Sequence, residues 1–242
     1  NYWDAESPTQ DLSHSTNLKA EYSISGELGY RHTGLINVTA SLFNYNMTNR
    51  QSSVSSYING RLVSQYMNAG GQTSRGAQFA LGLRPWHGFS PYVSFQYLHA
   101  TTDNNLPKGL EYLPTKGKIA INSPEYTVNV GLSYDDGHFF ANGYMSYVGS
   151  QYATYMNDEK MPAYAIGNVT LGYRFKKLWI AKYPQVQVNA QNISDNKYLA
   201  AGGGGLNAQT TRGVFGSTVK GSSPVYTIGG GFGLVVSVST GF

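Results

Sequence analysis

Few side chains in this sequence have the type and spacing that catalysis or metal binding requires. Cysteine is absent, which excludes disulfides, thiolate metal sites and cysteine nucleophiles. The histidines show no i, i+4 pairing, so we predict no metal site and no cofactor; they are His14, His32, His87, His99 and His138. The adjacent carboxylates Asp135-Asp136 and Asp158-Glu159 could act as acid and base, but solvation in a turn or loop explains both pairs. Because no Ser/His/Asn or Asp/His set suits hydrolysis, we do not expect an enzyme.

Two glycine-rich segments, 202–205 and 229–231, could be phosphate-binding loops. Neither is followed by a helical pattern or by lysine next to serine or threonine, so a flexible loop and small strand side chains are the better interpretation. Lysine and arginine are scattered and form no long run, despite a net charge of +4. We therefore expect no nucleic-acid partner.

The elements that must position the functional side chains are strands. From Asn17 to Arg31 apolar and polar residues alternate, and a helix would scatter the same apolar residues round its circumference. Similar alternation predicts about nine strands, and Gly70-Gly71 and Gly76 predict a bulge or a close approach within the third. The expected ranges are 17–31, 36–46, 61–83, 91–97, 126–134, 139–147, 165–175, 185–191 and 225–242. The last of these, which ends at Phe242, has the longest clean alternation.

The composition indicates that one face of these strands meets lipid. Charged residues make up 12%, against about 25% in an ordinary globular domain. The 20 tyrosines and 29 glycines fit strands with one apolar and one wet face. No run of about 18 apolar residues exists, so a closed barrel is the remaining way to span a membrane. A soluble β-sandwich would share the alternation but would not explain the unequal connections described next.

The expected connections are short at one end of the strands and long at the other. The short ones are 32–34, 84–89, 135–138 and 176–184. This is the pattern of outer-membrane barrels, with short periplasmic turns and long extracellular loops. An odd number of strands cannot close an antiparallel barrel, so we expect the C-terminal part of a larger one. Residues 1–16 are expected to be the remainder of an extracellular loop, and residues 17–242 the barrel itself.

Several motifs resemble those of the TonB-dependent outer-membrane receptors. The segment Asn192-Ile193-Ser194-Asp195-Asn196-Lys197-Tyr198 resembles the family's Asn-Leu-x-Asp-x-x-Tyr signature in the penultimate strand. The terminal Phe242 matches the aromatic C-terminus read by the barrel-assembly machinery. Weaker matches are Leu113-Pro114 with Pro124, Met161-Pro162-Ala163-Tyr164, and Gly76-Ala77-Gln78, where glutamine replaces the usual glutamate.

The resemblance implies an all-β transmembrane antiparallel barrel of about 22 strands, whose plug domain is missing from this chain. It also implies energised uptake of a scarce ligand, such as a ferric siderophore or other metal chelate. The implied partners are outer-membrane lipid and lipopolysaccharide, the TonB complex through a region absent from the sequence, and the barrel-assembly machinery through Phe242. The implied location is the bacterial outer membrane.

The sequence also suggests residues with a structural role and residues that could bind a ligand. Asn192, Asp195 and Tyr198 carry the family motif, and we assign them a structural role in ending a strand and shaping its loop. Ligand contacts are expected from aromatic and basic residues in the long loops. The candidates are Tyr57, Tyr66, Tyr112, Lys116, Lys118, Tyr152, Tyr155, Arg212 and Lys220. A passive porin or sugar channel is the alternative function, because such barrels share the same strand pattern.

Overall fold

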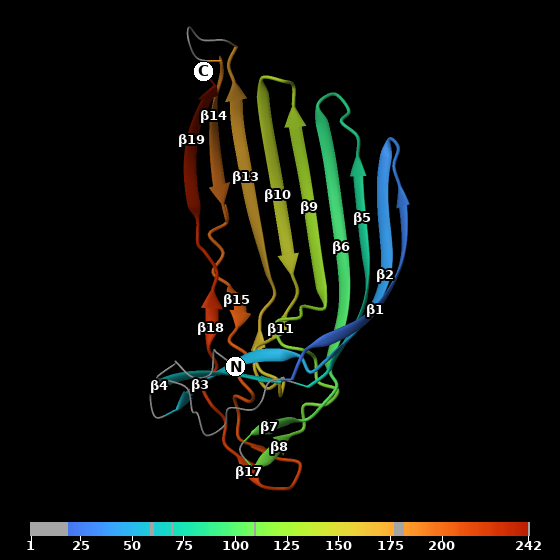
Figure 1. Ribbon diagram of the computed structural model, residues 1–242. Helices are drawn as coiled ribbons and strands as arrows, with labels where there is room; N and C mark the ends of the chain where they lie inside the picture. The colour runs from blue at the N-terminus through green and yellow to red at the C-terminus, as the bar shows by residue number, and fades with distance from the viewer. Residues whose placement is uncertain (1–18, 59–60, 69, 109, 177–181, 242) are drawn as a thin grey trace.

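Nine strands form one antiparallel sheet that bends into an arc in the computed structural model (Figure 1). The structure describes residues 19–58, 61–68, 70–108, 110–176 and 182–241. The strands of this sheet follow the order of the sequence, and β1 and β19 form its two edges. They are β1 (Tyr22–His32), β2 (Ile36–Thr48), β5 (Gln72–Leu83), β6 (Phe89–Thr102), β9 (Tyr126–Asp135), β10 (Phe139–Val148), β13 (Tyr164–Arg174), β14 (Lys182–Gln191) and β19 (Gly233–Gly241).

In every strand of this sheet most apolar residues lie on one face, although some, such as Ile166 and Val235, lie on the other. One cross-strand row runs from Val38 through Leu81, Val93, Val130 and Met145. Alternate residues point to opposite sides of a strand, so a register that pairs apolar residues makes a continuous apolar surface. That surface is uncovered: Leu28 is 76% exposed and Val238 is 73% exposed. Such a face is stable only against lipid, which confirms the membrane-facing strands predicted from the alternation.

The predicted difference between the two ends of the sheet is also confirmed. At one end the connections are short, as in residues 33–35 and 136–138. At the other end the chain leaves the sheet for residues 49–71, 103–125, 149–163 and 192–232. These long loops contain the small hairpins and lie together at the lower end of Figure 1. The small strands are β3 (Gln51–Ile58), β4 (Arg61–Asn68), β7 (Leu106–Lys108), β8 (Glu111–Leu113), β11 (Gln151–Tyr152), β12 (Lys160–Met161), β15 (Leu199–Gly202), β16 (Thr211–Arg212), β17 (Thr218–Val219) and β18 (Tyr226–Ile228).

Two of the predicted strands differ from the structure. The expected strand 61–83 is divided, because Gln72 already pairs with Met47 of β2, and the preceding residues fold into the separate hairpin β3–β4. The expected last strand is broken between β18 and β19. Gly229 lies against Tyr198, where an added Cβ would stand 2.1 Å from the ring, and its amide donates to the Tyr198 carbonyl. This bond extends the pairing of β18 with β15 by one residue, and the chain joins the nine-stranded sheet only from Gly233 onward.

The buried apolar core lies within the long loops, away from the sheet. It consists of Leu106, Leu113, Ile121, Tyr155, Met156, Leu206 and Val219. These residues come from three of the loops that follow β6, β10 and β14. The described residues include no helix long and apolar enough to cross a membrane.

Candidate functional site

The face of the sheet opposite the apolar surface, here called the polar face, is almost free of charge. From β2 to β19 its described side chains carry charge only at Asp135 and Arg174, which form an ion pair of 2.8 Å near the short-turn end. Edge strand β1 adds Glu27 and Arg31. Elsewhere serine, threonine, asparagine and glutamine dominate the polar positions of this face. The wall therefore offers hydrogen bonds but little Coulombic attraction.

Hydrogen bonds join neighbouring strands across the polar face. The Tyr144 hydroxyl donates to Asn129 Oδ1 at 2.7 Å, and Asn129 Nδ2 donates to Ser94 Oγ at 3.1 Å. Further along the sheet, Thr170 Oγ1 and Gln187 Nε2 both donate to Asn189 Oδ1. These contacts, which lie between strands except for the Gln187–Asn189 bond within β14, hold the amide groups in place, which favours recognition of a polar solute.

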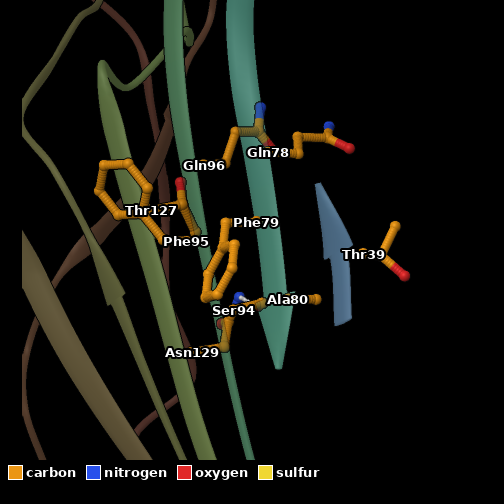
Figure 2. A pocket seen from close by; sticks show the side chains of 9 residues that line it. All are labelled: Thr39, Gln78, Phe79, Ala80, Ser94, Phe95, Gln96, Thr127 and Asn129. Carbon is orange, nitrogen blue, oxygen red and sulfur yellow. Dashed lines mark hydrogen bonds between the residues drawn. The ribbon is translucent and has the colours of Figure 1, made fainter. Parts of the chain in front are cut away.

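A small hollow of about 200 Å³ lies over β2, β5, β6 and β9. Figure 2 shows its lining, in which Gln78 and Thr39 point to the side opposite Phe79. The other polar groups there are Ser94, Gln96, Thr127 and Asn129. None of the lining side chains is ionisable, so this hollow shares the neutral character of the whole wall.

A larger hollow, of about 580 Å³, lies at the long-loop end of β13, β14 and β19, and we call it the amide hollow. Its size falls within the range of about 300–1,000 Å³ that small-molecule sites occupy. The lining residues are Ile166, Asn168, Val169, Thr170, Asn189, Ala190, Gln191, Asn192, Tyr198, Gly230, Gly231 and Val235. All are uncharged. The hollow is therefore the best candidate for a ligand contact on the wall itself.

Asn192 joins the end of β14 to the break before β19. It has a positive φ of 46° and is 4% exposed. Its Nδ2 donates to the carbonyls of Asn196 and Gly230, both at 2.9 Å, while its Oδ1 accepts from the Asn196 amide. Asparagine tolerates the left-handed conformation, and its amide can both donate and accept. These contacts turn the chain sharply at this point.

Asp195 and Tyr198 belong to the same segment that follows β14. Asp195 Oδ1 accepts from the Phe232 amide at 2.9 Å and from Lys197 Nζ at 2.8 Å. The lysine hydrogen bond is the main reason why the pKa of Asp195 is lowered, and the Phe232 amide lowers it further. Tyr198 stacks on Tyr164 with ring centroids 4.2 Å apart. Asn192 and Tyr198 of the motif thus border the amide hollow.

The long loops after β6, β10 and β14 pack into one unit, here called the loop cap. Glu111 is 6% exposed and holds two hairpins together: its carboxylate accepts from the amides of Phe215 and Ser217 at 2.8 and 3.0 Å. Burial raises the pKa of Glu111, but these bonds and the Tyr112 amide outweigh it, so that the pKa is lowered overall. A buried carboxylate without a cation thus acts as an anchor for backbone amides.

Asp158 anchors a second point of the loop cap. It accepts from the backbone amides of Ala208 and Gln209 and from Thr154 Oγ1. Lys108 Nζ bridges Asn207 and the Lys220 carbonyl at 2.6 and 2.9 Å, and burial lowers the pKa of Lys108. Burial and a hydrogen bond to Glu159 raise the pKa of Tyr226 to about 12. Several charged groups of the loop cap therefore form internal hydrogen bonds that hold the loops together.

The structure departs from the sequence expectation at Tyr155. We expected this side chain on an exposed loop, but it is 0% exposed and belongs to the apolar core of the loop cap. The core residues Leu106, Leu113 and Leu206 come from other loops. The sequence around Tyr155 therefore did not predict that its side chain would be buried. A ligand cannot reach this ring without disrupting the loop cap.

The other nominated residues do not converge on one site. Tyr112 is 43% exposed and meets Phe215 edge to face at 5.8 Å, while the Tyr152 ring lies 5.8 Å from Lys160 Nζ. Lys116, Arg212 and Lys220 are exposed on the loop cap, and Lys118 is partly buried. Tyr57 and Tyr66 belong to β3 and β4, but their side chains lie outside the described part, as does all of Phe242.

Sequence reasoning missed the residues of the amide hollow. Asn168, Asn189 and Gln191 were treated as the polar positions of strands, without regard to which of them meet. Their signal was available in the amide side chains at every second position of the expected strand 185–191, which ends at Gln191. Glu111 gave no signal, because its partners lie 104 and 106 residues away. Within the described part, no group of three or more His, Cys, Asp or Glu could hold a metal ion.

A curved antiparallel sheet with a lipid-facing apolar side and a polar inner side is the wall of a β-barrel of the outer-membrane type. Residues 2–193 match the family described as TonB dependent receptor-like, beta-barrel. The chain belongs to this family. No curated protein matches the sequence.

Solved structures with the same fold cover most of this chain. The ferric yersiniabactin uptake receptor FyuA from Yersinia pestis is similar, with a TM-score of 0.61 and 19% identity over 89% of this chain. The siderophore receptor PiuA from Acinetobacter baumannii has a TM-score of 0.63 and 16% identity over 89%. The ferric-catecholate import receptor Fiu from Escherichia coli K12 has a TM-score of 0.60 and 18% identity over 98% of this chain. This chain spans 29%, 28% and 30% of these three structures, respectively.

Proposed function

We propose that this chain forms part of the barrel wall of an outer-membrane receptor that takes up a scarce ligand, energised by the proton gradient through the TonB complex. The observation that carries the proposal is the continuous apolar surface across all nine strands, in a chain that belongs to the TonB-dependent receptor family. The open sheet would be completed by further strands. Its apolar surface would face membrane lipid and lipopolysaccharide, and Phe242 would be read by the barrel-assembly machinery.

The proposed ligand is a ferric siderophore or another metal chelate. Support comes from the similar solved structures, which are described as uptake receptors for ferric yersiniabactin and ferric catecholates. Another similar structure is described as a copper transporter, OprC, with 14% identity over 90% of this chain. The proposal therefore covers chelates of iron and of other metals.

The long loops would be extracellular and would make the first contacts with the ligand. The residues proposed for these contacts are Tyr57, Tyr66, Tyr112, Lys116, Lys118, Tyr152, Arg212 and Lys220. Tyr155 is not among them because its ring is buried. Aromatic and cationic side chains on a loop surface can hold ring-rich or anionic solutes by stacking and by charge.

The test is uptake of radiolabelled metal chelate by cells that produce the whole receptor. Uptake should be saturable and should fall to background when a protonophore dissipates the proton gradient, because the energy comes from the inner membrane. Cells that lack the gene provide the control for other routes. Saturable uptake that the protonophore leaves undiminished would contradict the proposal and would favour a passive channel.

A further inference from the structure

The amide hollow has a chemical character that bears on the charge of the ligand. Asn168, Asn189 and Gln191 are polar-face residues of β13 and β14, and all three line it. Thr170 and Tyr198 add hydroxyl groups, and Ile166 and Val235 add apolar surface. An amide offers both donors and acceptors, so the hollow can match carbonyl and hydroxyl groups of a solute.

No net charge lies close to this hollow among the described residues. Asp195 and Lys197 lie beside Gly231 of the lining, where an added Cβ would approach them within 3.0 and 3.2 Å. These two groups form an ion pair with each other at 2.8 Å. Asp135 and Arg174 are also paired, and they lie at the opposite end of the sheet. The field of each pair largely cancels beyond its immediate surroundings.

A neutral wall discriminates between solutes according to their charge. An anionic chelate that leaves water for the amide hollow loses hydration, and it gains no cation in return. A chelate with zero net charge loses less hydration, and the amides can replace its hydrogen bonds to water. The hydrogen bonds from Thr170 and Gln187 already hold the Asn189 side chain, which reduces the cost of ordering it on binding.

We infer that the amide hollow is a binding site for the uncharged class of metal chelate, with Asn168, Asn189 and Gln191 as its specificity-determining residues. This inference rests on the proposed function, since it selects among the ligands of the same receptor. The site favours a neutral ferric trihydroxamate over a trianionic ferric tricatecholate.

The first test measures binding without transport. Purified full-length receptor in detergent is titrated by calorimetry with a ferric trihydroxamate and with a ferric tricatecholate of similar size. The neutral chelate should bind at least about tenfold more tightly, which corresponds to roughly 1.4 kcal/mol. Tighter binding of the tricatecholate, or binding of neither chelate, would overturn the inference.

The second test adds a charge to the hollow. Gln191→Lys should raise the affinity for the tricatecholate by about threefold or more at low salt, because a cation now faces the trianion. Affinity for the trihydroxamate should stay nearly constant. Gln191→Glu should weaken tricatecholate binding further.

Gln185→Lys is the matched control. Gln185 lies on the same strand and the same face, but it pairs with Arg174 near the short turns and lies outside the hollow. It should change neither affinity. Equal effects at positions 185 and 191 would show that charge acts from a distance, and would overturn the assignment of the hollow. Because no step depends on the proton gradient, these results are separate from those of the uptake experiment.

Discussion

Glu111 holds the two outermost hairpins of the loop cap together through backbone amides. Its carboxylate accepts bonds from Phe215 and Ser217, and the Val214 amide donates to the Tyr112 carbonyl beside it. An ionised carboxylate in this position satisfies amides that would otherwise be buried without partners. The arrangement of β7–β8 against β16–β17 therefore depends on the charge of one residue.

That dependence predicts a loosening of the loop cap in acid. The folded-state pKa of Glu111 lies below its ordinary value of 4.5, so the carboxylate stabilises the folded loops above that value. The contribution is lost as the pH falls through the lowered pKa. Spin labels introduced by Lys116→Cys and Thr218→Cys should give a narrow distance distribution near pH 7 and a broader one at an acid pH below the lowered pKa. With Glu111→Gln, the distribution should be broad at both values; an unchanged, narrow one would contradict the role of the charge.

Gly213 is required by the same contact. An added Cβ would stand 2.0 Å from Glu111 Cγ, so Gly213→Ala must displace the carboxylate or the hairpin. Losing a buried hydrogen bond costs about 1–3 kcal/mol, and trypsin cleavage after Arg212 should become roughly tenfold faster. Gly205→Ala is the control in the same loop, because its Cβ would meet Thr154 Cγ2 at an ordinary 3.7 Å. Equal cleavage rates in the two variants would argue against the steric explanation.

At the scale of the strands, the sheet separates lipid from water by alternation alone. Met145 lies on the apolar surface, opposite Val130 and Gly167, and is 52% exposed. Ser146, the next residue, lies on the polar face opposite Asn129 and Ile166. Adjacent residues of one strand therefore occupy two different solvents.

This separation predicts opposite outcomes for the same substitution at neighbouring positions. Met145→Arg should lower the free energy of unfolding by about 2–4 kcal/mol, because an arginine near the bilayer midplane is poorly solvated. Ser146→Arg should have a much smaller effect, since the side chain enters the wet face. Denaturant unfolding of the receptor in lipid vesicles measures both. Comparable losses would show that the two faces do not differ in environment.

At the scale of the whole molecule, the two ends of the sheet differ: one has short turns and the other has the loop cap. The short turns leave little surface beyond the strands, whereas the loop cap has its own apolar core and ionic anchors. A folded cap of this kind can present residues to an outside ligand while its base stays fixed to the strands (Figure 1). The proposed orientation places this end outside the cell.

The orientation can be tested by labelling, because the sequence contains no cysteine. Lys116→Cys lies on an exposed part of the loop cap, and Thr33→Cys lies in the exposed turn between β1 and β2. A membrane-impermeant maleimide should label the first variant in intact cells, and the second only after the outer membrane is permeabilised. Preferential labelling of Thr33→Cys in intact cells would reverse the orientation.

Alternation along the chain was enough to predict most strands of the sheet and its two faces. Leu28, Val130 and Val238 were assigned to the apolar face from period-two alternation, because the direction of a side chain along a strand depends only on its position in that strand. The short turns and long loops followed from the gaps between alternating segments. Local motifs such as Asn192 to Tyr198 were enough to predict the family, to which the match over residues 2–193 assigns the chain.

The packing of the long loops and the positions of the hollows became visible only in the folded structure. The burial of Tyr155, the anchoring by Glu111 and the break in the last strand each depend on a partner far along the chain. The amide hollow likewise requires β13, β14 and β19 to meet in register. No local pattern encodes such contacts, because they arise from the packing of segments that the sequence keeps apart.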